Sequence, residues 1–104
     1  MTKLEKIKQL LESSGFPVTY HSFPEDDAPP MPYIVFLEPY SNNFSADGIT
    51  YSQISHIQVE LYTKFKEPEA EQKVESSLSS FFWNKSEFKI DSEKCYEIIY
   101  ELEV

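Results

Sequence analysis

The sequence predicts an α+β fold in which two helices pack on one face of an antiparallel or mixed sheet of four to five strands. Two segments repeat apolar residues at the spacing of an amphipathic helix, and other segments are β-rich or alternate apolar and polar residues. The predicted order is helix, three strands, helix, two strands. No helix sits regularly between parallel strands in this order, which favours that fold class. Residues 1–104 are expected to form a single domain.

The first predicted helix covers residues 3–14. Thr2 and Glu5 stand at the positions of a capping box, in which side chains bond the free amides at a helix start. Gly15 and Pro17 indicate the end, because glycine tolerates the backbone past a helix end and proline cannot continue the helix. The apolar face consists of Leu4, Ile7, Leu10 and Leu11.

Three strands are expected between the helices. Residues 18–23 and 33–37 are rich in β-branched and aromatic residues. Residues 24–32, which contain four prolines, and residues 41–48, Ser-Asn-Asn-Phe-Ser-Ala-Asp-Gly, are expected to be loops. The third strand, residues 49–63, is long enough that its first half is expected to project as a hairpin arm. One side of it carries Ile57, Val59 and Leu61, and the other carries His56, Gln58, Glu60 and Tyr62.

The second predicted helix covers residues 68–82. Pro68 fits its first turn, where the missing amide hydrogen costs nothing. Glu69 and Glu71 complement the positive end of the helix dipole. The expected buried stripe consists of Ala70, Val74, Leu78, Phe81 and Phe82.

Two strands are expected at the end of the chain. Phe88 and Ile90 mark a short strand, residues 91–94 a turn, and residues 95–104 the last strand. The last strand has the clearest alternation, which predicts that one of its sides is buried and the other is exposed. Its two sides carry Tyr96, Ile98, Tyr100, Leu102 and Val104, and Cys95, Glu97, Ile99, Glu101 and Glu103.

The net charge limits which classes of binding partner are expected. The chain has 9 basic and 18 acidic residues, a net charge of −9. This disfavours specific nucleic-acid binding, which needs basic side chains against the phosphates, and it disfavours an anionic membrane surface. Protein partners are therefore expected, although the acidity could serve solubility alone. Without a disulfide pair or a membrane-length apolar stretch, the protein is expected to be soluble and cytoplasmic.

No set of residues predicts catalysis, and we expect no enzymatic activity, no cofactor and no metal site. His21 and His56 lie on predicted strands without a further ligand at metal-binding spacing. Cys95 could serve as a nucleophile only if the fold brought a histidine beside it, and such a cysteine more often packs as a small apolar residue.

Two groups of residues are candidates for a functional surface. Exposed aromatic residues and methionine are enriched at protein interfaces, although here they could also pack on their own domain. Carboxylates that alternate with apolar residues on a strand are expected to face solvent or a channel, although burial could turn such a pair to acid–base chemistry. The interface candidates are Pro30, Met31, Tyr33, Tyr40 and Phe44, and the acidic candidates are Glu60, Glu97, Glu101 and Glu103.

Three segments resemble small structural proteins from the tail-morphogenesis region of phages and prophages of Gram-positive bacteria. They are Ala-Pro-Pro-x-Pro-Tyr-Ile-Val, Ser-Asn-Asn-Phe-x-Ala-Asp-Gly and Val-Glu-Leu-Tyr-Thr. The resemblance extends over most of the chain, from the first helix to the closing Tyr-Glu-Ile-Ile-Tyr-Glu strand. Such proteins resemble tail terminator (tail completion) and head–tail joining proteins, small α+β subunits that close into rings, typically hexameric, at the head-proximal end of the tail.

The resemblance implies other tail or connector proteins as partners and no catalytic residue or cofactor. It implies a subunit that is made in the bacterial cytoplasm, is monomeric until assembly, and ends in the virion tail. If DNA passes through the ring, the four acidic candidates are expected to line its lumen, because like charge prevents adsorption. The alternative is a small acidic regulatory or inhibitory module of a bacterium without a virion role. The solution mass and the neighbouring genes distinguish the two.

Overall fold

The computed structural model describes residues 2–24, 28–46 and 49–104, without the side chains of residues 40–54. It confirms the predicted class and the predicted order of elements. Among the described residues the elements are α1 (Lys3–Glu12), β1 (Val18–Tyr20), β2 (Tyr33–Ala46), β3 (Ile49–Thr63), α2 (Pro68–Ser77), β4 (Trp83–Ile90) and β5 (Cys95–Glu103).

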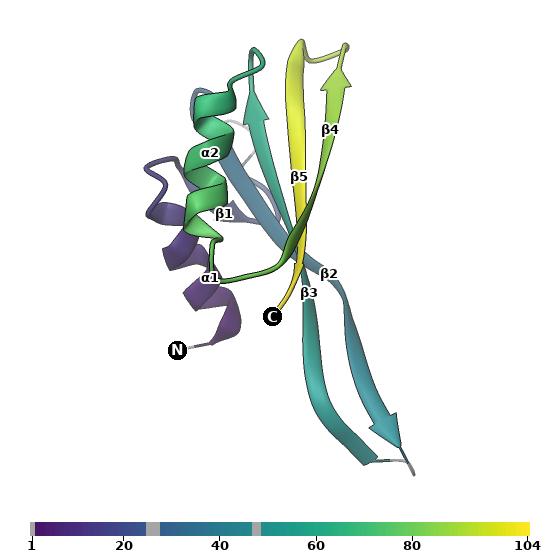
Figure 1. Ribbon diagram of the computed structural model, residues 1–104. Coiled ribbons are helices and arrows are strands. Elements are labelled where there is room, and N and C mark those ends of the chain that lie inside the picture. The colour runs from purple at the N-terminus through teal and green to yellow at the C-terminus, as the bar shows by residue number, and fades with distance from the viewer. Residues whose placement is uncertain (1, 25–27, 47–48) are drawn as a thin grey trace.

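The five strands form one mixed sheet in the order β1-β2-β3-β5-β4. β1 runs parallel to β2, and the other neighbours are antiparallel. Both helices lie on the same side of this sheet, as predicted (Figure 1). β1 is shorter than expected because His21 has a φ of 70°, a left-handed conformation that a strand does not continue.

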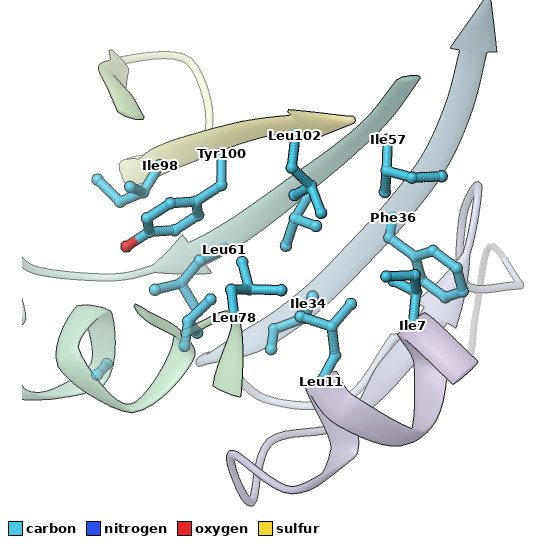
Figure 2. Packing of buried hydrophobic residues seen from close by; sticks show 13 residues of the cluster. Ile7, Leu11, Ile34, Phe36, Ile57, Leu61, Leu78, Ile98, Tyr100 and Leu102 are labelled. Atoms are coloured by element: carbon cyan, nitrogen blue, oxygen red, sulfur yellow. The ribbon is translucent and has the colours of Figure 1, made fainter. Parts of the chain in front are cut away.

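The hydrophobic core lies between the helices and the sheet. Figure 2 shows Ile7 and Leu11 of α1 close to β2. It also shows Leu78, which follows α2, close to Leu61 of β3. Ile57, Val59 and Leu61 are fully buried, which confirms the alternation predicted for β3. On β5 the same face contributes Ile98, Tyr100 and Leu102.

The cap of α1 forms as the sequence predicts. The Thr2 side chain accepts a hydrogen bond from the Glu5 amide at 3.1 Å, and its hydroxyl lies 3.2 Å from Glu5 Oε1. The helix ends at Glu12 rather than at residue 14. Gly15 follows with a φ of 92°, the conformation for which glycine was expected there.

The predicted end of the second helix is wrong. α2 ends at Ser77, and Phe82 is 87% exposed instead of completing the buried stripe. The chain turns after Leu78 so that β4 can begin at Trp83, five residues before the predicted strand. Trp83 is half-buried against the core and lies edge-on to Tyr100, with ring centroids 5.4 Å apart. The pairing of β4 with β5 sets where the strand begins, and the helical spacing of apolar residues does not show this pairing.

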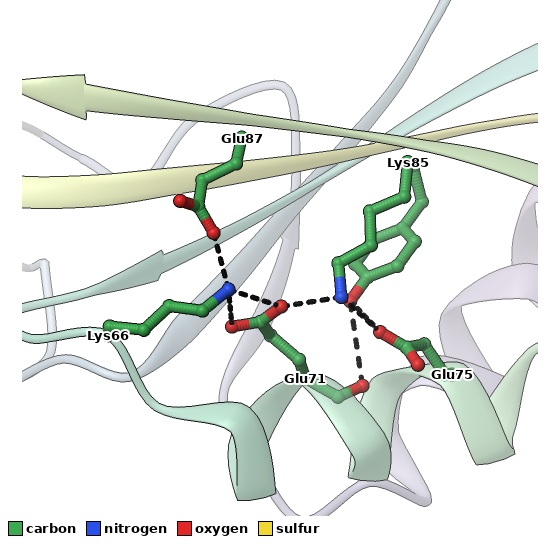
Figure 3. Close-up of polar contacts among 6 residues, drawn as sticks. Lys66, Glu71, Glu75, Lys85 and Glu87 are labelled. Atoms are coloured by element: carbon green, nitrogen blue, oxygen red, sulfur yellow. Dashed lines mark hydrogen bonds and ion pairs between the residues drawn. The ribbon is translucent and has the colours of Figure 1, made fainter.

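An ion-pair network joins α2 to β4 and to the segment before α2 (Figure 3). At its centre the buried Glu71 lies 2.7 Å from Lys66 Nζ and 2.6 Å from Lys85 Nζ. Lys85 also pairs with Glu75 at 2.8 Å, and Lys66 pairs with Glu87. Burial alone would raise the pKa of Glu71, but hydrogen bonds from both lysines lower it below its ordinary value. Glu71 is therefore a buried carboxylate held in its charged form.

The prediction of a loop over residues 41–48 is wrong for residues 41–46, which belong to β2. They pair with β3 from Ser41 opposite Ser55 to Ala46 opposite Ile49, with a register shift after Phe44. The neighbouring strand satisfies the backbone hydrogen-bonding groups, and this outweighs the loop preference of serine and asparagine.

The projecting hairpin predicted for this region is confirmed. We call residues 41–46 and 49–54 the arm. The described ladders of β1 and β5 reach β2 and β3 only outside this segment, so the two arm strands pair with each other alone. The arm extends away from the sheet in Figure 1, and the molecule measures 49 × 27 × 26 Å.

Candidate functional site

The sheet face opposite the helices, here called the open face, holds most of the predicted site residues. Among the described elements no helix covers it (Figure 1). The strand registers place alternate residues of each strand on it. Its central members are Tyr33, Val35, Gln58, Glu60, Tyr62, Glu97, Ile99, Glu101 and Glu103.

All four acidic candidates lie on the open face, but their surroundings differ. Glu101 and Glu103 are exposed, as expected. Glu60 and Glu97 lie on the solvent-facing side as expected, but they are half-buried. No described strand residue of this face is a lysine, because the lysines of β4 alternate onto the other face, and His56 at its arm end is buried. The face is therefore acidic along its length.

Glu60 and Glu97 are half-buried because the Tyr62 hydroxyl lies between them. It is 2.8 Å from Glu60 Oε1 and 2.7 Å from Glu97 Oε2, and Gln58 Nε2 donates to Glu60 Oε2 at 2.7 Å. Burial, followed by the hydrogen bonds to both carboxylates, raises the pKa of Tyr62 far above its ordinary value. Tyr62 therefore stays protonated, and both carboxylates lie within hydrogen-bonding distance of its single hydroxyl hydrogen.

A small pocket lies at the Tyr62 end of the open face. The Phe23 ring packs edge-on against Tyr33 at 5.2 Å between centroids, and Tyr33 lies 5.3 Å from Tyr62. With Glu60 and Glu93 these rings line a pocket of about 240 Å³. The sequence alone did not show this pocket, because Phe23 reaches it only when the chain after β1 folds back over β2.

The interface candidates divide into three groups. Pro30 is exposed, whereas Met31 and Tyr33 are half-buried, so the alternative that they pack partly on their own domain holds for these two. The backbones of Tyr40 and Phe44 pair with His56 and Ser52, and their side chains lie outside the described residues. Among the described residues, sequence reasoning missed four other exposed aromatic residues, Tyr20, Phe65, Phe82 and Phe88.

A second hollow lies near the base of the arm. It has a volume of about 450 Å³ and is lined by Phe82, Asn84, Glu101, Leu102, Glu103 and His56. It is open and acidic, and it places the exposed Phe82 ring beside the two exposed glutamates.

The structure does not bring Cys95 and a histidine together. Cys95 begins β5, whereas His56 pairs with Glu103 at the other end of that strand. Burial, and then the charges of Glu93 and Glu97, raise the pKa of the Cys95 thiol, which keeps it protonated. His21 is exposed at the end of β1. In the part of the chain that the structure describes, no group of three or more metal-binding side chains is present.

The fold and the site define a small α+β domain with a projecting arm and an acidic, uncovered sheet face. Comparison with protein-family models and with curated proteins finds no match to this chain. Among the described helices, none has the length and apolar character that crossing a membrane requires.

Proposed function

We propose that the chain is a structural subunit of a phage or prophage tail, a tail terminator or head–tail joining component that assembles into a ring. The observation that carries this proposal is the arm. A two-stranded ribbon without further strands is marginally stable, and its outer edges present unpaired backbone groups. Contacts with a neighbouring subunit or with the tail tube would satisfy these groups. The resemblance to tail-region proteins runs through the same segment.

Shortening the arm tests the proposal. Ser41 and Ser55 are paired, so the residues between them can be replaced by an Asn-Gly turn. The remaining sheet and the helices are kept, and the variant should fold with the circular dichroism of an α+β protein. In the phage or prophage that encodes the chain, electron microscopy should show that it fails to complete tails. Normal tails with the shortened arm would refute the proposal.

In this ring the open face would line the channel. Its exposed glutamates, Glu101 and Glu103, would repel the DNA phosphates, whereas lysines there would add salt-dependent affinity. The double reversal Glu101→Lys and Glu103→Lys should keep the ring, bind DNA and impair DNA ejection. The matched control is Glu12→Lys with Glu69→Lys, the same change in charge at exposed positions of the helices. Normal DNA ejection by the Glu101→Lys, Glu103→Lys variant would show that the open face does not line the channel.

The acidic open face also favours a second candidate, a bacterial regulatory or inhibitory module that binds a basic protein. Such a module would remain a monomer or dimer in the presence of tail proteins. Light scattering after chromatography, with and without the neighbouring tail proteins, separates this candidate from a ring subunit. The identity of the neighbouring genes provides a second, independent test.

A further inference from the structure

We propose that the pocket between Phe23, Tyr33 and Tyr62 binds the cationic side chain, lysine or arginine, of a partner protein. All three aromatic rings line this pocket. Phe23 and Tyr33 meet edge to face, and Tyr33 and Tyr62 are tilted by 35°. A cation placed over the face of any of these rings is attracted by the electron-rich ring. This inference concerns the isolated subunit and does not rest on assembly into a ring.

Two carboxylates make the pocket negatively charged. Glu60 and Glu93 line it together with the rings. The Glu60 carboxylate is held in place by Gln58 and by the Tyr62 hydroxyl. A phenol that donates to a carboxylate becomes more electron-rich, which strengthens its attraction for a cation. Rings and carboxylates thus favour the same kind of ligand.

The cationic partner has to come from outside the pocket. None of the described residues that line the pocket is lysine, and the sequence contains no arginine. Burial, and then the nearby Cys95 and Glu93, raise the pKa of Tyr33, as expected where the surroundings are negative and partly dehydrated. The one imidazole among the described lining residues belongs to His21, which is exposed, and the pocket has no lysine or arginine of its own beside Glu60 and Glu93.

The size of the pocket limits what enters it. Its volume of about 240 Å³ lies below the roughly 300 Å³ at which sites for drug-sized ligands begin. One ammonium or guanidinium group with the end of its aliphatic stem fits such a space. A side chain projecting from a protein surface supplies this shape, and the acidic open face beyond the pocket would attract a basic surface.

Nuclear magnetic resonance titration of the full chain tests the proposal. The probes are capped tripeptides Gly-Lys-Gly, Gly-Arg-Gly and Gly-norleucine-Gly, together with the free cation tetramethylammonium. The lysine and arginine peptides should shift the amide signals of Phe23, Tyr33 and Tyr62 with a Kd of about 1 mM. Added salt should weaken this binding, because the attraction is partly electrostatic. The neutral norleucine peptide should shift none of these signals.

Two variants and one control locate the binding. Phe23→Leu removes one ring from a loop outside the sheet, and Glu60→Gln removes one charge while keeping the side-chain shape. Each should weaken lysine-peptide binding by about fivefold or more. Glu103→Gln removes a charge from the same face, four residues along the register from Glu60, and should change the affinity less than about twofold. Thermal melting confirms that all three variants are folded.

Three results would overturn the inference. Equal binding of the lysine and norleucine peptides would show that charge is not recognised. Binding of tetramethylammonium without binding of either basic peptide would indicate a small-molecule site instead. Equal losses in Glu60→Gln and Glu103→Gln would show that only the general acidity of the face matters. None of these results depends on tail assembly, so the inference and the proposed function fail separately.

Discussion

Replacing Lys85 with methionine should destabilise the protein through the network of Figure 3. Lys85 Nζ lies 2.6 Å from the carboxylate of Glu71, whose side chain is 4% exposed. Methionine keeps the aliphatic stem and removes the charge. The buried carboxylate is then left with Lys66 as its remaining lysine partner.

The expected loss is about 1–3 kcal/mol, the cost of a buried acceptor that loses a partner. Breaking a fully buried ion pair costs more, about 3–5 kcal/mol. The cost is smaller here because Lys66 stays 2.7 Å from Glu71, and because the Lys85 side chain is 33% exposed and only partly dehydrated. Each kcal/mol should lower Tm by about 4–8 °C in a domain of this size.

Urea unfolding measures this loss, and Lys89→Met is the matched control. Lys89 lies on the same strand and the same face as Lys85, but its partner Asp91 is 3.8 Å away and both side chains are mostly exposed. Such a surface pair contributes little, so the control should cost less than about 0.5 kcal/mol. Equal losses in the two variants would refute the reasoning, since they would show that burial of Glu71 gives Lys85 no special role.

Three further predictions follow from the same structure. The folded pKa of Glu71 lies below its ordinary value of 4.5, so its charge stabilises the fold above pH 4.5. This stabilisation is lost as the pH falls through the folded pKa. In Glu71→Gln the urea midpoint should therefore fall less steeply with decreasing pH than it does in the unchanged protein. Leu78→Ala should cost about 2–5 kcal/mol because Leu78 is fully buried, and a loss as small as that of the half-buried Leu10→Ala would contradict this. The buried Cys95 thiol should react slowly with iodoacetamide at pH 8 until urea unfolds the chain, and Cys95→Ala should leave tail assembly intact.

The sequence predicted correctly those parts of the fold that depend on residues close together in the chain. A strand with one buried side must alternate, so the inward residues of β3 and β5 could be read directly from the sequence. The start of α1 was equally local, because a capping side chain bonds an amide three residues away. Thr2 and Glu5 confirm this in the structure.

The parts that sequence missed depend on distant partners. Residues 41–46 became a strand because β3 supplies their hydrogen-bond partners, although their composition favours a loop. Phe82 lost its expected burial because pairing with β5 starts β4 at Trp83. Alternation alone predicted the members of the acidic face. It did not predict that Tyr62 joins Glu60 to Glu97, because that contact depends on the register between β3 and β5.

The two ends of the open face should respond differently to salt, and this separates their roles. Glu101 and Glu103 are exposed, so ionic strength screens their effect on any charged partner. Glu60 and Glu97 are half-buried and held by Tyr62, so their effect on a cation in the neighbouring pocket is screened less. His56 pairs with Glu103 and Tyr62 pairs with Glu97, so six residue steps along β3 separate these two glutamates by roughly 20 Å, which is more than twice the Debye length at physiological ionic strength. Charge at Glu103 therefore acts largely independently of charge at Glu97, so the proposed repulsion of DNA near the arm is compatible with the proposed binding of a basic side chain at the pocket.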